Sequence, residues 1–210
     1  KLISICKKYK IDLIEDGSQS FGAKYKGRMN GSFGKISAIS HNPMKVFGAL
    51  GESGSILVDQ SRLCEKLISL RYNGTINKET CIYPSLNGRM DTIQAAVLIE
   101  KMKFLKNIIK KRRTNAAYYS SELNNILELP IEKEYEKDVY YTYTIKTDKK
   151  KKLMKYLNQK GIETKIQHPL LMPQQPAYNK NIKGSFTNAK KIIKTVLCIP
   201  IHENLKESDL

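Results

Sequence analysis

The first half of the chain alternates between hydrophobic patterns typical of helices and of strands. Apolar residues recur at helical spacing over residues 2–9, which predicts that the chain opens in a helix. Short apolar runs bounded by glycine or polar residues then predict strands at 11–14, 36–40 and 55–58, and a helix over 62–70. This alternation favours an α/β layer with parallel strands.

The second half begins with a long apolar stripe. Asp91 is a residue type suited to an N-cap, and seven apolar residues after it share one helical face: Ile93, Ala96, Val97, Phe104, Leu105, Ile108 and Ile109. This predicts a single connector helix reaching toward Tyr119. Further patterns predict a second group of elements: strands at 139–145, 162–167 and 197–201, a helix ending near Gly161 and a helix starting at Thr187.

We therefore expect two domains. Residues 1–115, which include the connector helix, would form one domain, and residues 116–210 would form a smaller α/β domain.

Composition narrows the class of protein. The chain has 210 residues and 40% hydrophobic content, which supports a packed core. No secretory signal appears, and no apolar run approaches the roughly 18 residues of a membrane span. The four cysteines and three histidines show no metal-ligand spacing, so no metal site is expected, and a reducing, cytoplasmic compartment fits best.

The formal charge of +17 raises the alternative of a nucleic-acid-binding module. Lysine greatly outnumbers arginine and is spread along the chain, and no nucleic-acid-binding motif accompanies it. The densest basic runs, at 110–113 and 149–152, fall on predicted helices and are explained as solvated faces. We expect no nucleic-acid partner.

Polar residues follow the predicted strands at positions suited to chemistry. Asp16 and Gln19 follow the first strand, Ser40 ends the second, and Lys45 comes just before a glycine-rich turn at 48–54. Ligands of open α/β sheets bind at the carboxyl ends of the strands, so these side chains should meet at one edge. A carboxylate for a pyridinium nitrogen, a hydroxyl for a phosphate and a lysine for an imine are what pyridoxal phosphate requires.

At this point the chain resembles the DegT/DnrJ/StrS-type pyridoxal-phosphate-dependent sugar aminotransferases. Five stretches carry the resemblance in order: 14–23, 31–34, 40–45 with its glycine turn, 87–96 and 174–178. The resemblance implies an aspartate-aminotransferase-like α/β fold (fold type I). Residues 1–115 would be the C-terminal part of the large cofactor-binding domain, with a mostly parallel sheet, and residues 116–210 would be the small C-terminal α/β domain, truncated at its end. The chain would correspond to the C-terminal two-thirds, roughly, of a family member.

The resemblance also implies roles for individual residues. Lys45 would form the imine with the cofactor and shuttle the proton. Asp16 would pair with the pyridinium nitrogen, Gln19 would lie against the ring and Ser40 would bind the phosphate. Asn87 would reach the phosphate of the neighbouring subunit, which implies a homodimer with a shared active site.

Substrate contacts are implied at two further residues. Arg89 and His168 would lie near the sugar nucleotide or the amino donor. Alternative explanations remain open for several positions: Ser40 could simply end a strand, Asn87 with Gly88 could be a turn, Arg89 could pair with Asp91, and His168 could be an ordinary loop residue.

The implied activity is transfer of an amino group, with glutamate as the expected donor, to a nucleotide-linked keto sugar for surface polysaccharide or glycan synthesis. An inactive regulatory or binding protein with the same fold is the alternative. His41 and Pro169 depart from aromatic residues that are common in the family, so the sugar is left open. Relatives carry an N-terminal segment with a phosphate-binding turn, so we expect the 210-residue chain alone to bind cofactor poorly.

Overall fold

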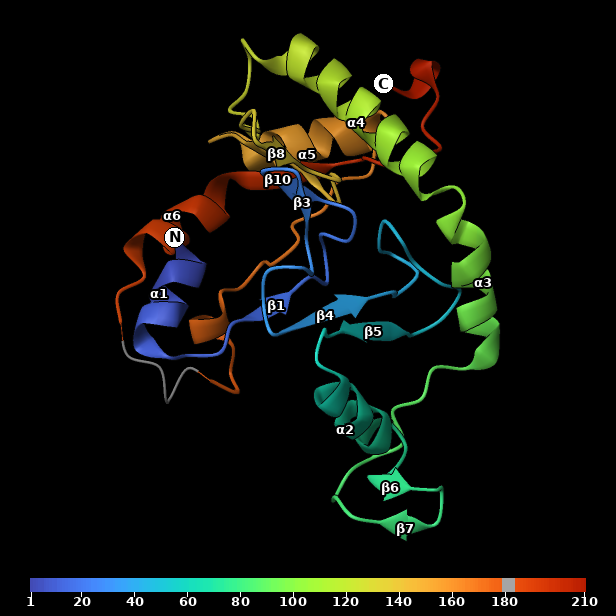
Figure 1. The fold of residues 1–210 in the computed structure, drawn as a ribbon. Coiled ribbons are helices and arrows are strands. Elements are labelled where there is room, and N and C mark those ends of the chain that lie inside the picture. Colours follow the sequence, from blue (N-terminus) through green and yellow to red (C-terminus); the bar gives the residue numbers. More distant parts are fainter. Residues whose placement is uncertain (179–183) are drawn as a thin grey trace. The chain divides into compact units, whose positions relative to one another are not determined.

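A three-stranded sheet organises the first part of the computed structural model, which describes residues 1–178 and 184–210 (Figure 1). Its order is β1 (Ile14–Asp16), β4 (Ile36–Ser40), β5 (Gly54–Leu57). β1 and β4 are parallel, whereas β4 and β5 are antiparallel.

Two expectations about this sheet need correction. The third strand is antiparallel, because the chain turns back through residues 41–53 without the helical crossover that a parallel connection normally uses. The first strand covers Ile14–Asp16 instead of 11–14, because β4 begins opposite Ile14 at Ile36. Asp16 is therefore the last residue of β1 and does not follow it.

The chain divides into two compact units. The first consists of residues 1–109 and 133–139, and the second of residues 110–132 and 140–210. The domain boundary between residues 115 and 116 stays a prediction. No helix in the described part of the chain is long and apolar enough to cross a membrane.

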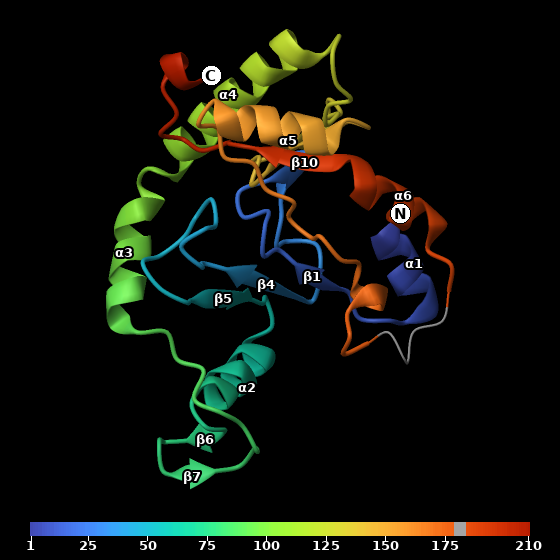
Figure 2. The same ribbon diagram turned by 180° about the vertical axis from the view of Figure 1, so that it is seen from behind.

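Three helices and several short strands complete the first unit, and α2 lies beside the hairpin of β6 and β7 (Figure 2). The remaining elements of this unit are α1 (Leu2–Tyr9), α2 (Ser61–Arg71), α3 (Thr92–Met102), β2 (Lys24–Tyr25), β3 (Arg28–Met29), β6 (Thr75–Ile76), β7 (Thr80–Cys81) and β8 (Glu136–Lys137). β3, β2 and β8 form an antiparallel sheet.

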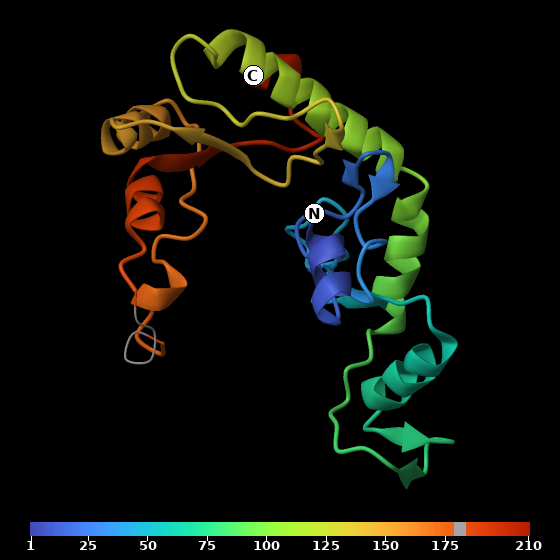
Figure 3. The same cartoon turned by 60° about the vertical axis from the view of Figure 1, so that its left-hand side comes forward.

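The predicted single connector helix is two helices. α3 ends at Met102 and α4 (Leu105–Leu123) follows after a short turn (Figure 3). The turn is tightened by i→i−3 bonds from Lys103 N to Glu100 O, 3.2 Å, and from Phe104 N to Lys101 O, 3.0 Å. Asp91 does occupy the N-cap position of α3, but its side chain makes no capping bond within the described residues.

The core of the first unit joins α3 to the segment that follows β4. Its buried members are Phe47, Ala49, Leu98 and Leu105, and partly buried Phe21, Met90 and Ile109 pack against them. The loop between β4 and β5 is thus anchored in the core through its own apolar residues.

The second unit contains a two-stranded antiparallel sheet and its own core. Its elements are the C-terminal part of α4, β9 (Tyr143–Lys146), α5 (Lys150–Gln159), η1 (Met172–Gln174), α6 (Thr187–Thr195), β10 (Val196–Ile199) and η2 (Glu207–Asp209). Buried Tyr143, Ile145 and Leu197 pack against Ala116 and Tyr119 of α4.

Two strand predictions in this unit were too long. The strand expected over 139–145 is only β9, and 162–167 contributes a single bridge, from Lys165 to Cys198. Tyr140 has a φ of 49°, which is outside the extended region, so the strand cannot begin before it. The β-branched and aromatic residues at 139–145 led to the longer strand prediction, but such residues are favoured at buried positions as well as in strands.

Candidate active site

Two strand ends define the site. β1 ends at Asp16 and β4 ends at Ser40, and because these strands are parallel both ends lie at the same edge of the sheet. Gly17 N donates to Ala38 O at 2.8 Å, which continues the pairing past Asp16. Gln19 is exposed in the turn at 18–22 that follows.

Asp16 is held as a carboxylate. Its Oδ1 accepts a hydrogen bond from Ser18 N at 3.0 Å. The pKa of Asp16 is lowered, first by the Ser18 side chain, then by the Ser18 backbone, and also by the positive charge of Lys45. Asp16 is exposed and the modest burial it has opposes the shift. The contribution of Lys45 is the smallest of these causes.

Lys45 lies in the loop between β4 and β5, with its side chain half-buried. The three residues Val46, Phe47 and Ala49 are almost fully buried and fix the C-terminal side of the loop in the core. On the N-terminal side, Asn42 O accepts from Lys45 N at 2.9 Å, and Asn42 Oδ1 accepts from Met44 N at 2.9 Å. The backbone on both sides of Lys45 is therefore tied down.

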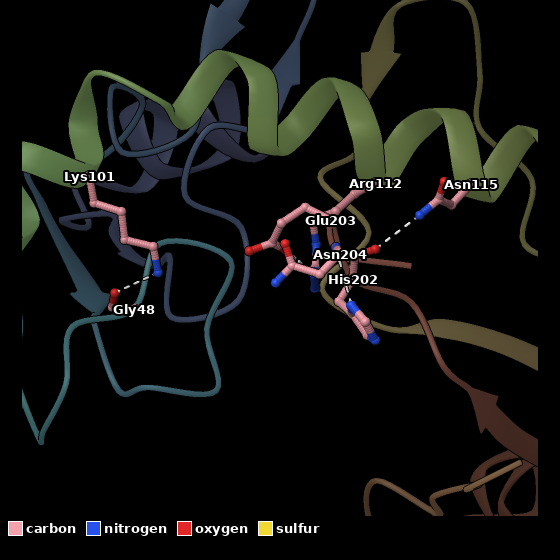
Figure 4. Close-up of polar contacts among 7 residues, drawn as sticks. All are labelled: Gly48, Lys101, Arg112, Asn115, His202, Glu203 and Asn204. Carbon is pink, nitrogen blue, oxygen red and sulfur yellow. Dashed lines mark hydrogen bonds and ion pairs between the residues drawn. The ribbon is translucent and has the colours of Figure 1, made fainter. Parts of the chain in front are cut away.

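Helix α3 holds the same loop from outside. Gln94 Oε1 accepts from the backbone of Leu50 and of Gly51, each at 2.9 Å, and Lys101 Nζ donates to Gly48 O at 2.8 Å (Figure 4). A Cβ on Gly48 would lie 2.5 Å from Asn42 O, so this close backbone approach requires glycine. Sequence reasoning included Gln94 in a family-like stretch but gave it no role.

Glu15 is a second residue that sequence reasoning missed. Its carboxylate accepts three backbone hydrogen bonds, from Gly31 N at 2.9 Å, Phe33 N at 2.7 Å and Gly34 N at 2.6 Å. The stretch 31–34 is thus explained as a loop that wraps a carboxylate. Strand alternation was the available signal, because it places Glu15 on the sheet face opposite to Asp16.

Asn87 and Arg89 lie next to the end of α2, in the first unit. Asn87 forms an isolated bridge with Tyr72, and its Oδ1 accepts from Arg89 Nε at 3.1 Å. The Arg89 guanidinium lies over the Tyr72 ring, 4.2 Å from its centroid. The alternative ion pair with Asp91 does not form among the described residues.

His168 belongs to the second unit. It is exposed, and it lies between the bridge residue Lys165 and the short helix η1. No group of three histidine, cysteine, aspartate or glutamate residues in the described ranges could hold a metal ion.

A polar cluster in the second unit ties the C-terminal segment to α4. Arg112 pairs with Glu203 at 2.9 Å, and their side chains are 6% and 22% exposed. Asn115 Nδ2 donates to His202 O at 2.9 Å, and His202 Nδ1 accepts from Asn204 N at 3.2 Å (Figure 4). Burial lowers the pKa of Arg112, partly offset by Glu203, but an arginine remains charged.

Comparison with known proteins places the chain in a family. The model of the DegT/DnrJ/EryC1/StrS aminotransferase family matches residues 1–210, so the chain belongs to this family. The family expectation from the five sequence stretches is confirmed.

Individual relatives match along nearly the whole chain. A dTDP-3-amino-3,6-dideoxy-alpha-D-galactopyranose transaminase of Aneurinibacillus thermoaerophilus is 33% identical over 94% of the chain and 54% of its own length. A pleiotropic regulatory protein of Geobacillus stearothermophilus is 32% identical over 98% of the chain and 57% of its own length.

Solved structures agree with the fold. DesV of S. venezuelae, solved in complex with a ketimine intermediate, is 29% identical with a TM-score of 0.95, over 99% of this chain and 57% of that one. NtdA of Bacillus subtilis, solved with the cofactor PMP, is 28% identical with a TM-score of 0.85, over 99% and 50%. The chain therefore spans little more than half the length of these relatives, less than the two-thirds expected.

Proposed function

We propose that the protein is a pyridoxal-phosphate-dependent aminotransferase. It would move an amino group from an amino acid, with glutamate as the donor, to a nucleotide-linked keto sugar used in surface polysaccharide or glycan synthesis. One observation carries the proposal: the parallel strands β1 and β4 bring Asp16 and Ser40 to the same edge of the sheet, and the loop that leaves this edge carries Lys45. Family membership supplies the reaction class.

The residues at the sheet edge fit the cofactor. Asp16 is ionised, so it can hold a proton on a ring nitrogen, and Gln19 lies in the turn beyond it. Ser40 Oγ accepts from Asn42 N at 3.3 Å, and its hydroxyl hydrogen can be donated to a phosphate oxygen. When bound, pyridoxal phosphate supplies an electron sink that makes loss of a proton from the amino-bearing carbon feasible.

Lys45 would handle the proton in both half-reactions. Its Nζ would take up the proton released from the amino-bearing carbon of the donor, and later deliver a proton to the sugar carbon that gains nitrogen. The Lys45 side chain is half-buried and its backbone is fixed on both sides, which restricts the positions that Nζ can take. Proton transfer depends on such a restricted orientation.

The substrate side of the site would involve residues outside this edge. Asn87 would reach the phosphate site of a second subunit in a homodimer with shared active sites. Arg89 and His168 would contact the sugar nucleotide or the donor carboxylate. Arg89 is positively charged and both side chains are exposed, so both can bind an anionic substrate that arrives from solvent.

Chemical trapping at Lys45 tests the proposal. The full-length protein is incubated with pyridoxal phosphate, reduced with borohydride and mapped by mass spectrometry. We expect the added mass on the peptide that contains Lys45. Lys45→Ala should remove both the label and turnover, whereas Lys103→Ala, at an exposed surface pair with Glu100, should change neither. A label on another lysine, with activity retained in Lys45→Ala, would contradict the proposal.

A regulatory role is the second candidate. It is favoured by the 32% identity to a protein named as a pleiotropic regulator. In that case a Lys45→Ala protein should complement a deletion strain as well as the unmodified protein does. Under the enzymatic proposal the same strain should lack the aminated sugar.

A further inference from the structure

His41 is a buried polar residue in the loop that carries Lys45. It directly follows Ser40 and is only 4% exposed. Its ring packs edge-on against two phenylalanines: the centroid distances are 5.9 Å to Phe21 and 5.4 Å to Phe47, with interplanar angles of 84° and 85°. An aromatic ring of similar size would fill the same space, so packing alone does not explain a histidine.

Both ring nitrogens of His41 have hydrogen-bond partners. Nδ1 lies 3.1 Å from Phe47 O, and Nε2 lies 2.9 Å from Ser55 Oγ. A carbonyl oxygen can only accept, so Nδ1 carries the hydrogen, and Nε2 of the neutral ring accepts from the Ser55 hydroxyl. Burial lowers the pKa of His41, and the Phe47 carbonyl offsets this only in part, which keeps the ring neutral.

The backbone of His41 closes the loop. His41 N donates to Ser53 O at 2.8 Å, and His41 O accepts from Ala49 N at 2.7 Å. Together with the side-chain bond to Phe47 O, these contacts join the two ends of the segment 41–49. Lys45 lies in the middle of the segment that they close.

We infer that His41 is a positioning residue for Lys45. Its neutral imidazole, with the hydrogen on Nδ1, links Phe47 on one side to Ser55 of β5 on the other, and so fixes the loop from which Lys45 approaches the sheet edge. This inference rests on the proposed function for the chemistry of Lys45, but the ordering of the loop can be measured without cofactor.

Hydrogen exchange tests the ordering. Amide exchange is followed by mass spectrometry in the cofactor-free full-length protein for peptides within 42–51. His41→Phe keeps a ring but removes both side-chain hydrogen bonds, so exchange should rise roughly tenfold or more. Ser55→Ala removes only the Nε2 partner and should give about a fivefold rise. Amides of α5, which belongs to the second unit, serve as the internal control and should not change.

Steady-state kinetics test the positioning. In the holoenzyme, His41→Phe should lower kcat at least tenfold with little change in KM for the nucleotide sugar, and Ser55→Ala should lower kcat less. Unchanged exchange in 42–51, or faster exchange with an unchanged kcat, would overturn the inference. If His41→Phe does not fold, Ser55→Ala decides by the same criteria. Retained turnover in Lys45→Ala would reject the proposed function and leave the exchange result intact.

Discussion

Removing the Glu15 carboxylate should destabilise the first unit more than its partial exposure suggests. Glu15 accepts hydrogen bonds from Gly31 N, Phe33 N and Gly34 N at 2.9, 2.7 and 2.6 Å. Hydrogen bonds to charged groups contribute about 1.5–3 kcal/mol each. The three share one carboxylate and water can reach the site, so we expect Glu15→Ala to cost about 3 kcal/mol, well below the simple sum.

A graded series separates the parts of this effect. Glu15→Gln keeps one acceptor oxygen for Phe33 N and Gly34 N, both of which bond to Oε1 in the structure. It places an amide group, which donates, opposite Gly31 N. Glu15→Gln should therefore lower the free energy of unfolding by about 1.5 kcal/mol, about half the effect of Glu15→Ala.

The assay is urea unfolding of the cofactor-free full-length protein, followed by far-UV circular dichroism and compared through midpoints at constant slope. Glu100→Gln is the matched control, because Glu100 is 62% exposed and pairs only with Lys103 among the described residues. It should cost at most about 0.5 kcal/mol. If Glu15→Ala and Glu100→Gln shift the midpoint equally, the three bonds to Glu15 do not hold the loop and the reasoning is wrong.

Two other predictions concern charged groups. Glu203→Ala should leave the Arg112 guanidinium buried without its partner and lower the thermal unfolding midpoint by the equivalent of about 3 kcal/mol. Replacing the pair with apolar residues, Arg112→Met together with Glu203→Leu, should recover most of this loss. A double-mutant cycle measures both effects. Ser18→Ala should raise the pKa of Asp16, because Ser18 is the main cause of its lowering; carboxyl NMR titration measures it. Because the pKa of Asp16 is lower in the folded than in the unfolded protein, its ionisation stabilises the fold at pH values above the unfolded-state pKa. This stabilisation is lost as the pH falls through the folded-state pKa. Ser18→Ala should therefore make the contribution of Asp16 to the free energy of unfolding smaller.

Hydrophobic periodicity predicted where elements lie better than how they connect. Apolar spacing located α1, α2 and β4, because apolar residues recur at helical spacing in the two helices and burial alternates along β4. The same spacing predicted one helix where the structure has α3 and α4, because apolar residues continue across the turn and no glycine or proline marks it at Lys103. Strand direction also escaped prediction, since it depends on how the loop at 41–53 folds back.

The candidate site shows a similar division. Asp16, Ser40 and Lys45 could be selected from residue type and strand position. The residues that hold the lysine loop could not, because the bonds of Gln94 and Lys101 span 43 to 53 residues of sequence and leave no local pattern. The role of such a side chain can be seen only in the three-dimensional structure, where it lies next to the distant backbone segment that it binds.

The alternation of Glu15 and Asp16 along β1 makes the site intolerant of a shift in strand register. The pairing of Asp16 with Ala38 sends one carboxylate to the sheet edge near Lys45 and the other into the loop at 31–34. Moving β1 by one residue would exchange the two faces. A single-residue insertion or deletion just before Glu15 would then cost the loop its acceptor and the lysine its neighbouring charge together, so fold and chemistry would fail in one step.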